Sequence, residues 1–200
     1  MHLNISGLFG KILLVSFIGF LAWAYQATRP PAPKLCGSPD GPPITAPRIK
    51  LSDGRYLAYK EHGVPKDKAA YKIVYVHGFD SCRHDAVIAN NDVIESLGVY
   101  IVSFDRPGYG ESDPNPKRTE KGIALDIEEL ADALGLGSKF YVVGFSMGGQ
   151  VVWTCLKYIP HRYVHYNIAY IDKGRGEEIY LVAFKKFKSL SSFCHILGLV

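Results

Sequence analysis

The sequence predicts an α/β fold, and two observations support that prediction. Three short segments are almost continuously apolar, as parallel strands are when both of their faces are buried: Lys72–Val76, Val99–Phe104 and Phe140–Val143. Segments with the spacing of helices separate these strands and follow the last one. Strands that alternate with helices in this way are typical of a mainly parallel sheet covered by helices.

A β-hairpin is expected ahead of the first parallel strand. The dipeptide Asp53-Gly54 favours a tight turn, and short strand-like segments, Arg48–Ser52 and Tyr56–Lys60, lie on either side of it.

Three helices are expected, each with a signal at its end. The first runs from about Asp85 and stops at Gly98. The second has Thr119 as its N-cap and Gly135 as its stop signal, with apolar residues at helical spacing: Ile123, Ile127, Leu130, Ala131 and Leu134. The third covers Met147–Tyr158, because Pro160 does not continue a helix.

The N-terminus carries a long apolar segment. Between Ile5 and Tyr25 the only charged residue is Lys11, and these 21 residues are enough to cross a bilayer of about 30 Å. We therefore expect residues 1–28 to form a single-pass membrane anchor that binds the membrane through residues 5–25. The alternative is a signal segment cleaved near Ala22-Trp23-Ala24, which would make the protein secreted.

The rest of the chain divides by composition. Residues 29–47 contain seven prolines and are expected to be an extended linker, 48–162 the folded domain and 163–200 a separate tail. Residues 36–160 carry 14 basic and 16 acidic side chains, so they have no concentrated basic face for nucleic acid. The four cysteines have no metal-site spacing; free thiols are expected, with a Cys36–Cys82 disulfide as the alternative.

The segment Gly144-Phe145-Ser146-Met147-Gly148-Gly149 is the main chemical signal. It has the G-x-S-x-G pattern of a nucleophile elbow and lies between a predicted strand and a predicted helix, which is the setting that such an elbow requires. The simpler interpretation is a glycine-rich turn without chemistry.

Two more motifs end predicted strands. His77-Gly78-Phe79-Asp80 closes the first parallel strand, and Asp105-Arg106-Pro107-Gly108 opens the loop after the second. We expect Asp105 and Arg106 to form a buried pair that organises this loop; the alternative is an anion clamp.

With these three motifs in order, residues 47–162 resemble the α/β-hydrolase superfamily, and most closely its plant-type membrane-anchored members. The resemblance implies the N-terminal portion of that fold, with Ser146 as nucleophile after the fifth strand. It also implies that the backbone N–H groups of Phe79 and Met147 form the oxyanion hole. Serine at this position is unlike the epoxide hydrolase and dehalogenase branches, which place aspartate there.

The same resemblance implies hydrolysis of an ester-like substrate without a cofactor or metal ion. The family order is serine, then an acid, then histidine. Asp172 and His195 satisfy this order as acid and base, but separations of 26 and 23 residues are too short for the later strands and lid of the family. His161 and His165 follow the elbow helix too closely and are expected at the wrong end of the sheet.

The sequence therefore leaves two functions open. One is a serine hydrolase for a small or lipid-like ester, in a chain that ends early and lacks its acid and base. The other is a non-catalytic truncated isoform or a membrane-anchored interaction module on a partial hydrolase fold.

Overall fold

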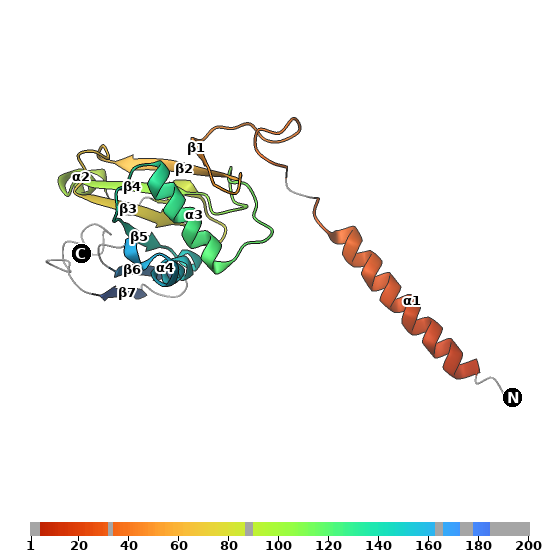
Figure 1. Cartoon of the computed structure of the whole chain (residues 1–200). Coiled ribbons are helices and arrows are strands. Elements are labelled where there is room, and N and C mark those ends of the chain that lie inside the picture. Colours follow the sequence, from red (N-terminus) through yellow and green to blue (C-terminus); the bar gives the residue numbers. More distant parts are fainter. Residues whose placement is uncertain (1–4, 32–33, 87–89, 163–165, 173–177, 185–200) are drawn as a thin grey trace. The chain divides into compact units, whose positions relative to one another are not determined.

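A computed structural model describes residues 5–31, 34–86, 90–162, 166–172 and 178–184 of the chain. For residues 5, 6, 166–172 and 178–184 it describes the backbone alone. The chain divides into two compact units, Met1–Lys34 and Leu35–Val200, and each is described by itself (Figure 1).

The first unit contains one long helix, α1 (Ile5–Thr28). Its 22-residue stretch Gly7–Thr28 is long and apolar enough to cross a membrane, a property that membrane anchors share with signal sequences. Its large apolar side chains, from Leu8 to Tyr25, are all exposed.

The second unit is built on a five-stranded sheet: β1 (Arg48–Lys50), β2 (Tyr56–Gly63), β3 (Tyr71–Val76), β4 (Val99–Phe104) and β5 (Tyr141–Gly144). The strand order is β1-β2-β4-β3-β5. The first two strands form the expected hairpin, and β2 pairs with β4 in antiparallel register. The strands β4, β3 and β5 are parallel, so their carboxyl ends lie at one edge of the sheet. The predicted α/β plan is confirmed.

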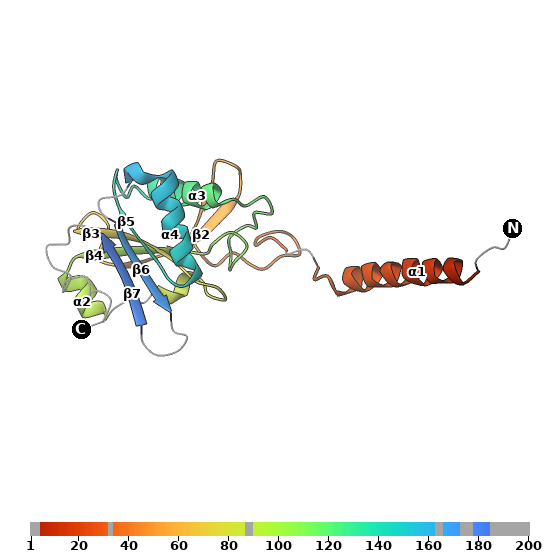
Figure 2. The same cartoon turned by 90° about the horizontal axis from the view of Figure 1, so that it is seen from below.

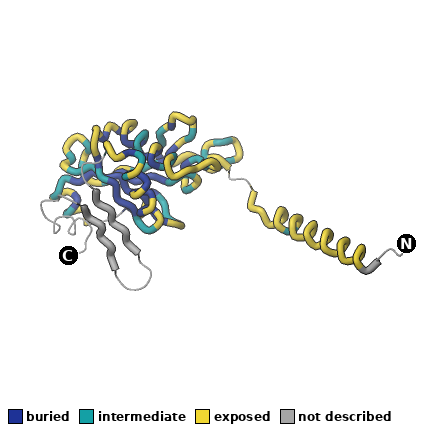
Figure 3. The backbone as a smooth tube through the Cα atoms, turned by 60° about the horizontal axis from the view of Figure 1, so that its bottom comes forward, coloured by how far each residue is buried: buried dark blue, intermediate teal, exposed yellow. Residues whose placement is uncertain are grey.

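Helices cover both faces of this sheet (Figures 1 and 2). On one face α3 (Glu120–Ala133) and α4 (Met147–Tyr158) close the larger core around Val74, Phe104 and Ile127. On the other face α2 (Asn91–Ser96) and the 3₁₀ turn η1 (Arg83–Asp85) close a smaller core around Ile73 and Ile101. The central strands are consequently the most buried part of the molecule (Figure 3).

Two of the predicted helices are confirmed, and one is corrected. Thr119 caps α3 by accepting a hydrogen bond from the Gly122 N–H, as expected. The helix expected from Asp85 starts later, because the side chain of Asn90 accepts from the Asp92 N–H and caps α2 there. Asp85 instead ends η1.

The proline-rich segment before β1 lies in the second unit from Leu35 onward. Gly37 N–H donates to the carbonyl of Pro42 at 2.8 Å, and Arg48 Nη1 donates to the carbonyl of Cys36 at 3.3 Å. This part of the expected linker is therefore folded onto the domain. Cys36 and Cys82 are free thiols, as is Cys155.

Beyond α4 the chain forms the turn η2 (Pro160–Arg162) and two strands, β6 (Tyr166–Asp172) and β7 (Glu178–Phe184). These strands pair with each other in antiparallel register as a separate two-stranded sheet. In the described sheet β5 is therefore an edge strand.

Candidate active site

Ser146 lies in a sharp turn between β5 and α4, at the carboxyl edge of the sheet. Its backbone angles are φ 50° and ψ −119°, and Ser146 and Asp80 are the two non-glycine residues with positive φ among those described. A side chain in this conformation costs about 1–3 kcal/mol, so it persists only where surrounding structure imposes it. This is the strained strand-to-helix turn that a nucleophile elbow requires.

The glycines on each side of Ser146 are needed because backbone passes very close to them. A Cβ on Gly144 would lie 2.3 Å from the carbonyl oxygen of Gly148. A Cβ on Gly148 would lie 2.1 Å from the carbonyl oxygen of Val76, at the end of β3. Both distances are shorter than any real contact, so the G-x-S-x-G spacing follows from this packing.

The loop after β3 lies directly against the elbow. A Cβ on Gly78 would lie 3.1 Å from the Cβ of Ser146, and the Phe145 N–H donates to the carbonyl of Val76 at 2.9 Å. Phe79 follows in this loop, and Met147 is the first residue of α4, whose N–H has no partner within the helix. The predicted oxyanion donors thus come from two segments that flank the serine.

His77 supports this loop and is not placed as a base. It is fully buried, and its Nδ1 lies 2.8 Å from the carbonyl oxygen of Gly78, to which it donates. Its Nε2 accepts from the Arg106 N–H at 2.9 Å and therefore carries no proton. Burial lowers the pKa of His77, which agrees with a neutral ring.

The predicted pairing of Asp105 with Arg106 is wrong. Asp105 is completely buried and is bound by the guanidinium of Arg83, whose own N–H also donates to it at 2.8 Å. Arg106 Nη2 instead donates to the carbonyl of Gly78 at 2.7 Å. Asp105 does organise the loop that follows it, because the Glu111 N–H donates to its carboxylate at 3.0 Å.

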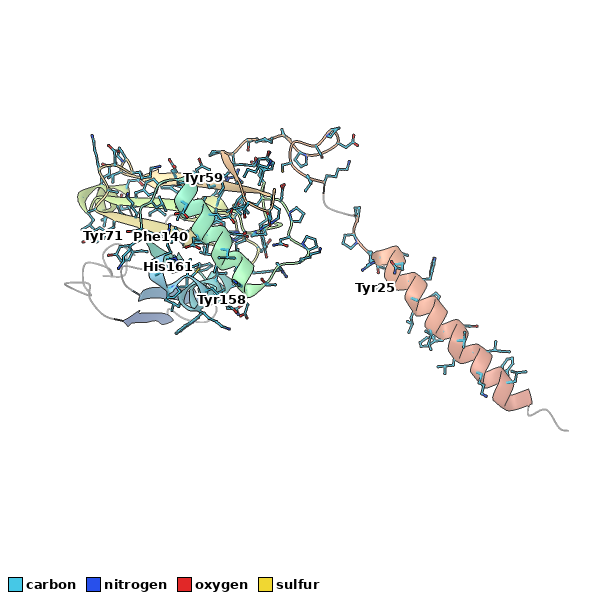
Figure 4. All side chains as sticks on the ribbon, viewed as in Figure 1. Tyr25, Tyr59, Tyr71, Phe140, Tyr158 and His161 are labelled. Carbon is cyan, nitrogen blue, oxygen red and sulfur yellow. The ribbon has the colours of Figure 1, made fainter. Side chains whose placement is uncertain are left out.

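The later candidate residues are not brought to the serine in the described structure. Asp172 ends β6, where the backbone alone is described, and His195 and His165 lie outside the described residues. His161 follows α4, at the end of that helix away from Ser146, and its Nε2 lies 2.9 Å from Glu128 Oε1 of α3 (Figure 4). Within the described ranges, no group of three or more His, Cys, Asp or Glu side chains could hold a metal ion.

Sequence analysis missed the contact of Arg106 with the loop after β3. The two partners are 28 positions apart, and they meet only because β3 and β4 are neighbours in the sheet. A basic residue two positions after a buried strand was the available signal, but it did not reveal the partner.

Comparison with known proteins agrees with this geometry. Residues 71–162 match a family model described as the alpha/beta hydrolase fold, and this range contains the elbow and both supporting loops. Residues 71–162 thus form part of an α/β-hydrolase fold.

Solved α/β-hydrolase-like structures overlap this chain in part. A hydrolase from Pseudomonas aeruginosa PA01 is 26% identical with a TM-score of 0.50; the match covers 59% of this chain and 43% of that one. An esterase from Exiguobacterium antarcticum shares the fold at 22% identity and a TM-score of 0.52, over 64% of this chain and 45% of that one. The matched part of this chain thus spans less than half the length of both structures.

A curated protein also aligns with part of this chain. A multifunctional-autoprocessing repeats-in-toxin from Vibrio vulnificus is 25% identical over 121 residues, which are 55% of this chain and 2% of the toxin.

Proposed function

We propose that this chain is a serine hydrolase of the α/β-hydrolase superfamily, in which Ser146 attacks the carbonyl carbon of an ester. The observation that carries the proposal is the positive φ of Ser146 in a turn that the Gly78 loop packs against. An ordinary glycine-rich turn gives no reason to place a serine, rather than glycine, at a strained position.

The proposed reaction is acyl transfer to water. A base takes the proton of the Ser146 hydroxyl as its oxygen attacks, and the negative charge that develops on the carbonyl oxygen is held by the N–H groups of Phe79 and Met147. The alcohol leaves with a proton, and water then releases the acid from the acyl-serine. Asp172 and His195 remain the candidate acid and base because they follow the serine in the family order. The step requires no cofactor.

The surface beside the serine favours an apolar ester. Phe79 is 70% exposed and Met147 is 40% exposed, so two apolar side chains flank Ser146 in contact with solvent. Covering these side chains with a hydrocarbon chain removes apolar surface from water and is favourable, whereas covering them with a charged group would cost that group its hydration. A lipid-like ester also fits a chain with an apolar N-terminal helix.

Labelling with a fluorophosphonate probe tests this function directly. The full chain in detergent micelles is incubated with the probe, beside a Ser146→Ala variant. Labelling that disappears in S146A is expected, because the probe reacts with a serine only when a base activates it. A folded sample with no labelling, or labelling that persists in S146A, contradicts the proposal.

A second candidate is a membrane-anchored binding module without catalysis. It is favoured by the surroundings of Ser146: among the described side chains, none forms a hydrogen bond with its hydroxyl, and His77 is occupied at both ring nitrogens. A cooperatively unfolding but unlabelled protein would support this function over the first.

A further inference from the structure

The peptide group between Gly78 and Phe79 is held by two hydrogen-bond donors. The Gly78 carbonyl oxygen accepts from Arg106 Nη2 at 2.7 Å and from His77 Nδ1 at 2.8 Å. The N–H of Phe79 belongs to the same planar group and points opposite to this carbonyl. Whatever fixes the carbonyl therefore also fixes the direction of the proposed oxyanion donor.

Arg106 also supports the second of these donors. Its backbone N–H donates to His77 Nε2 at 2.9 Å, which forces the ring proton onto Nδ1, where it faces the Gly78 carbonyl. One residue thus contributes one hydrogen bond directly and determines the other through the histidine tautomer.

The charge of Arg106 is not neutralised by a carboxylate in the described structure. The neighbouring Asp105 pairs with Arg83, and the guanidinium of Arg106 lies 4.7 Å from the ring centroid of Tyr109. Arg106 is half-buried, where a positive charge is screened less than at the surface. This charge lies against the loop after β3, which carries the proposed oxyanion donor.

We infer that Arg106 is a positioning residue of the oxyanion hole: it orients the Gly78–Phe79 peptide and places a positive charge behind it. The inference rests on the proposed function of Ser146. It extends that function by assigning a role in transition-state stabilisation to a residue outside the G-x-S-x-G and His-Gly motifs.

Arg48 provides a matched control. Its guanidinium lies 4.7 Å from the ring centroid of Tyr56, and its Nη1 donates to a backbone carbonyl, that of Cys36. It therefore makes the same kinds of contact as Arg106 but lies on β1, at the edge of the sheet away from β5. Loss of packing alone should affect the two variants alike.

The kinetic test compares fluorophosphonate labelling of the full chain with that of R106Q and R48Q. Loss of one oxyanion donor costs about 10²–10³ in rate, so a donor that is only disordered should cost at least about tenfold. We expect the maximal labelling rate of R106Q to fall by about tenfold or more, with the half-saturating probe concentration within about twofold. R48Q should keep both values. Equal maximal rates in the two variants would overturn the inference.

A spectroscopic test separates this inference from the proposed function. Glycine labelled with ¹³C at the carbonyl and phenylalanine labelled with ¹⁵N make visible only the three Gly-Phe peptides of the chain, which begin at Gly19, Gly78 and Gly144. In R106Q the Gly78 signal should shift while the Gly19 signal stays, and R48Q should change neither. An unshifted Gly78 signal overturns the inference even if Ser146 is reactive. If the Gly78 signal shifts in R106Q but the wild-type Ser146 does not react with the fluorophosphonate, Arg106 does orient the Gly78–Phe79 peptide, and it is the proposed function that is refuted.

Discussion

At the scale of single residues, Ser146 shows how local strain is imposed by neighbours. The turn is closed by hydrogen bonds from the Gly148 N–H to the Phe145 carbonyl at 2.7 Å and from the Gly149 N–H to the Ser146 carbonyl at 2.9 Å. Gly144 and Gly148 let the strand and helix approach closely enough for these bonds to form. This positive-φ conformation is sterically unfavourable for a residue with a Cβ, such as Ser146, and favourable for glycine.

This strain predicts that Ser146→Gly stabilises the protein. Glycine adopts positive φ without steric cost, so S146G should gain about 1 kcal/mol of unfolding free energy over S146A, which keeps the Cβ. Urea unfolding of the full chain in detergent micelles, followed by circular dichroism, measures the difference. Higher stability of S146G would be informative because glycine usually lowers stability: it increases the conformational entropy of the unfolded chain. Equal or lower stability of S146G would show that the turn is not strained by its side chain.

At the scale of elements, the loop after β4 connects several parts of the domain. Asp105 and Glu111 in this loop both bind Arg83 of η1, and Glu111 also accepts from the N–H groups of Thr45 and Ala46 at 2.8 and 3.0 Å. The segment that leads into β1 is thereby fixed to the carboxyl edge of the sheet. Gly110 makes this possible, because a Cβ there would lie 2.1 Å from the Asp105 carboxylate.

The Glu111 carboxylate should make stability depend on pH. Burial alone would raise the pKa of Glu111, but hydrogen bonds from Thr45 and Ala46 and the charge of Arg83 outweigh it and lower this pKa from 4.5 to about 2. Because the folded-state pKa is lowered, the stabilisation is complete above the unfolded value of 4.5 and is lost as the pH falls toward 2. The shift corresponds to roughly 3 kcal/mol at neutral pH.

Glu111→Gln tests this linkage. Wild type should be more stable than E111Q by about 3 kcal/mol at pH 7, and the difference should shrink by about 1 kcal/mol at pH 3.5. Urea unfolding of the full chain at both pH values gives the two differences. The exposed Glu95 of α2 supplies a control, since E95Q should behave like wild type. A difference between wild type and E111Q that is the same at both pH values would contradict the prediction.

At the scale of the whole molecule, the chain combines an apolar helix with a folded domain. The described part of the domain has a core on each face of its sheet, whereas α1 leaves its large apolar side chains exposed. An uncovered apolar helix of this length is stable in a bilayer and unstable in water. The remaining alternatives are an anchor that stays and a signal segment that is removed.

A single charge in the middle of α1 should weaken a membrane anchor, and the mass of the mature protein should distinguish an anchor from a cleaved signal segment. An arginine at the centre of a membrane helix costs about 2.5–3.5 kcal/mol, so Phe17→Arg should move part of the protein from the alkali-resistant membrane fraction into the soluble fraction. Gln26→Arg, near the helix end, should have little effect because its side chain can reach the interface. Intact-mass measurement of the membrane fraction should find residues 1–28 still attached. A mature protein that begins after Ala24 would establish the secreted alternative.

Local signals in the sequence were sufficient for the elements of this protein. The apolar runs, the Asp53-Gly54 turn and the Thr119 cap depend on neighbouring residues, and the structure has the strands, the hairpin and α3 where they indicate. The elbow at Ser146 was also accessible, because its glycines are set by contacts within and beside one turn. The missed start of α2 had a local signal as well, because Asn90 is a residue type that commonly caps helices.

Tertiary structure alone decided which residues meet across the sheet. Strand order β4-β3-β5 differs from chain order, and it brings Arg106 to the Gly78 carbonyl and Arg83 to Asp105. These partners are more than 20 positions apart, and several charged residues in the sequence were equally plausible partners for each. Spacing along a chain determines local conformation, whereas the pairing of buried charges depends on which strands become neighbours. The sequence by itself thus determined the turn that presents Ser146, and the packed sheet determined which side chains hold the loop after β3 beside it.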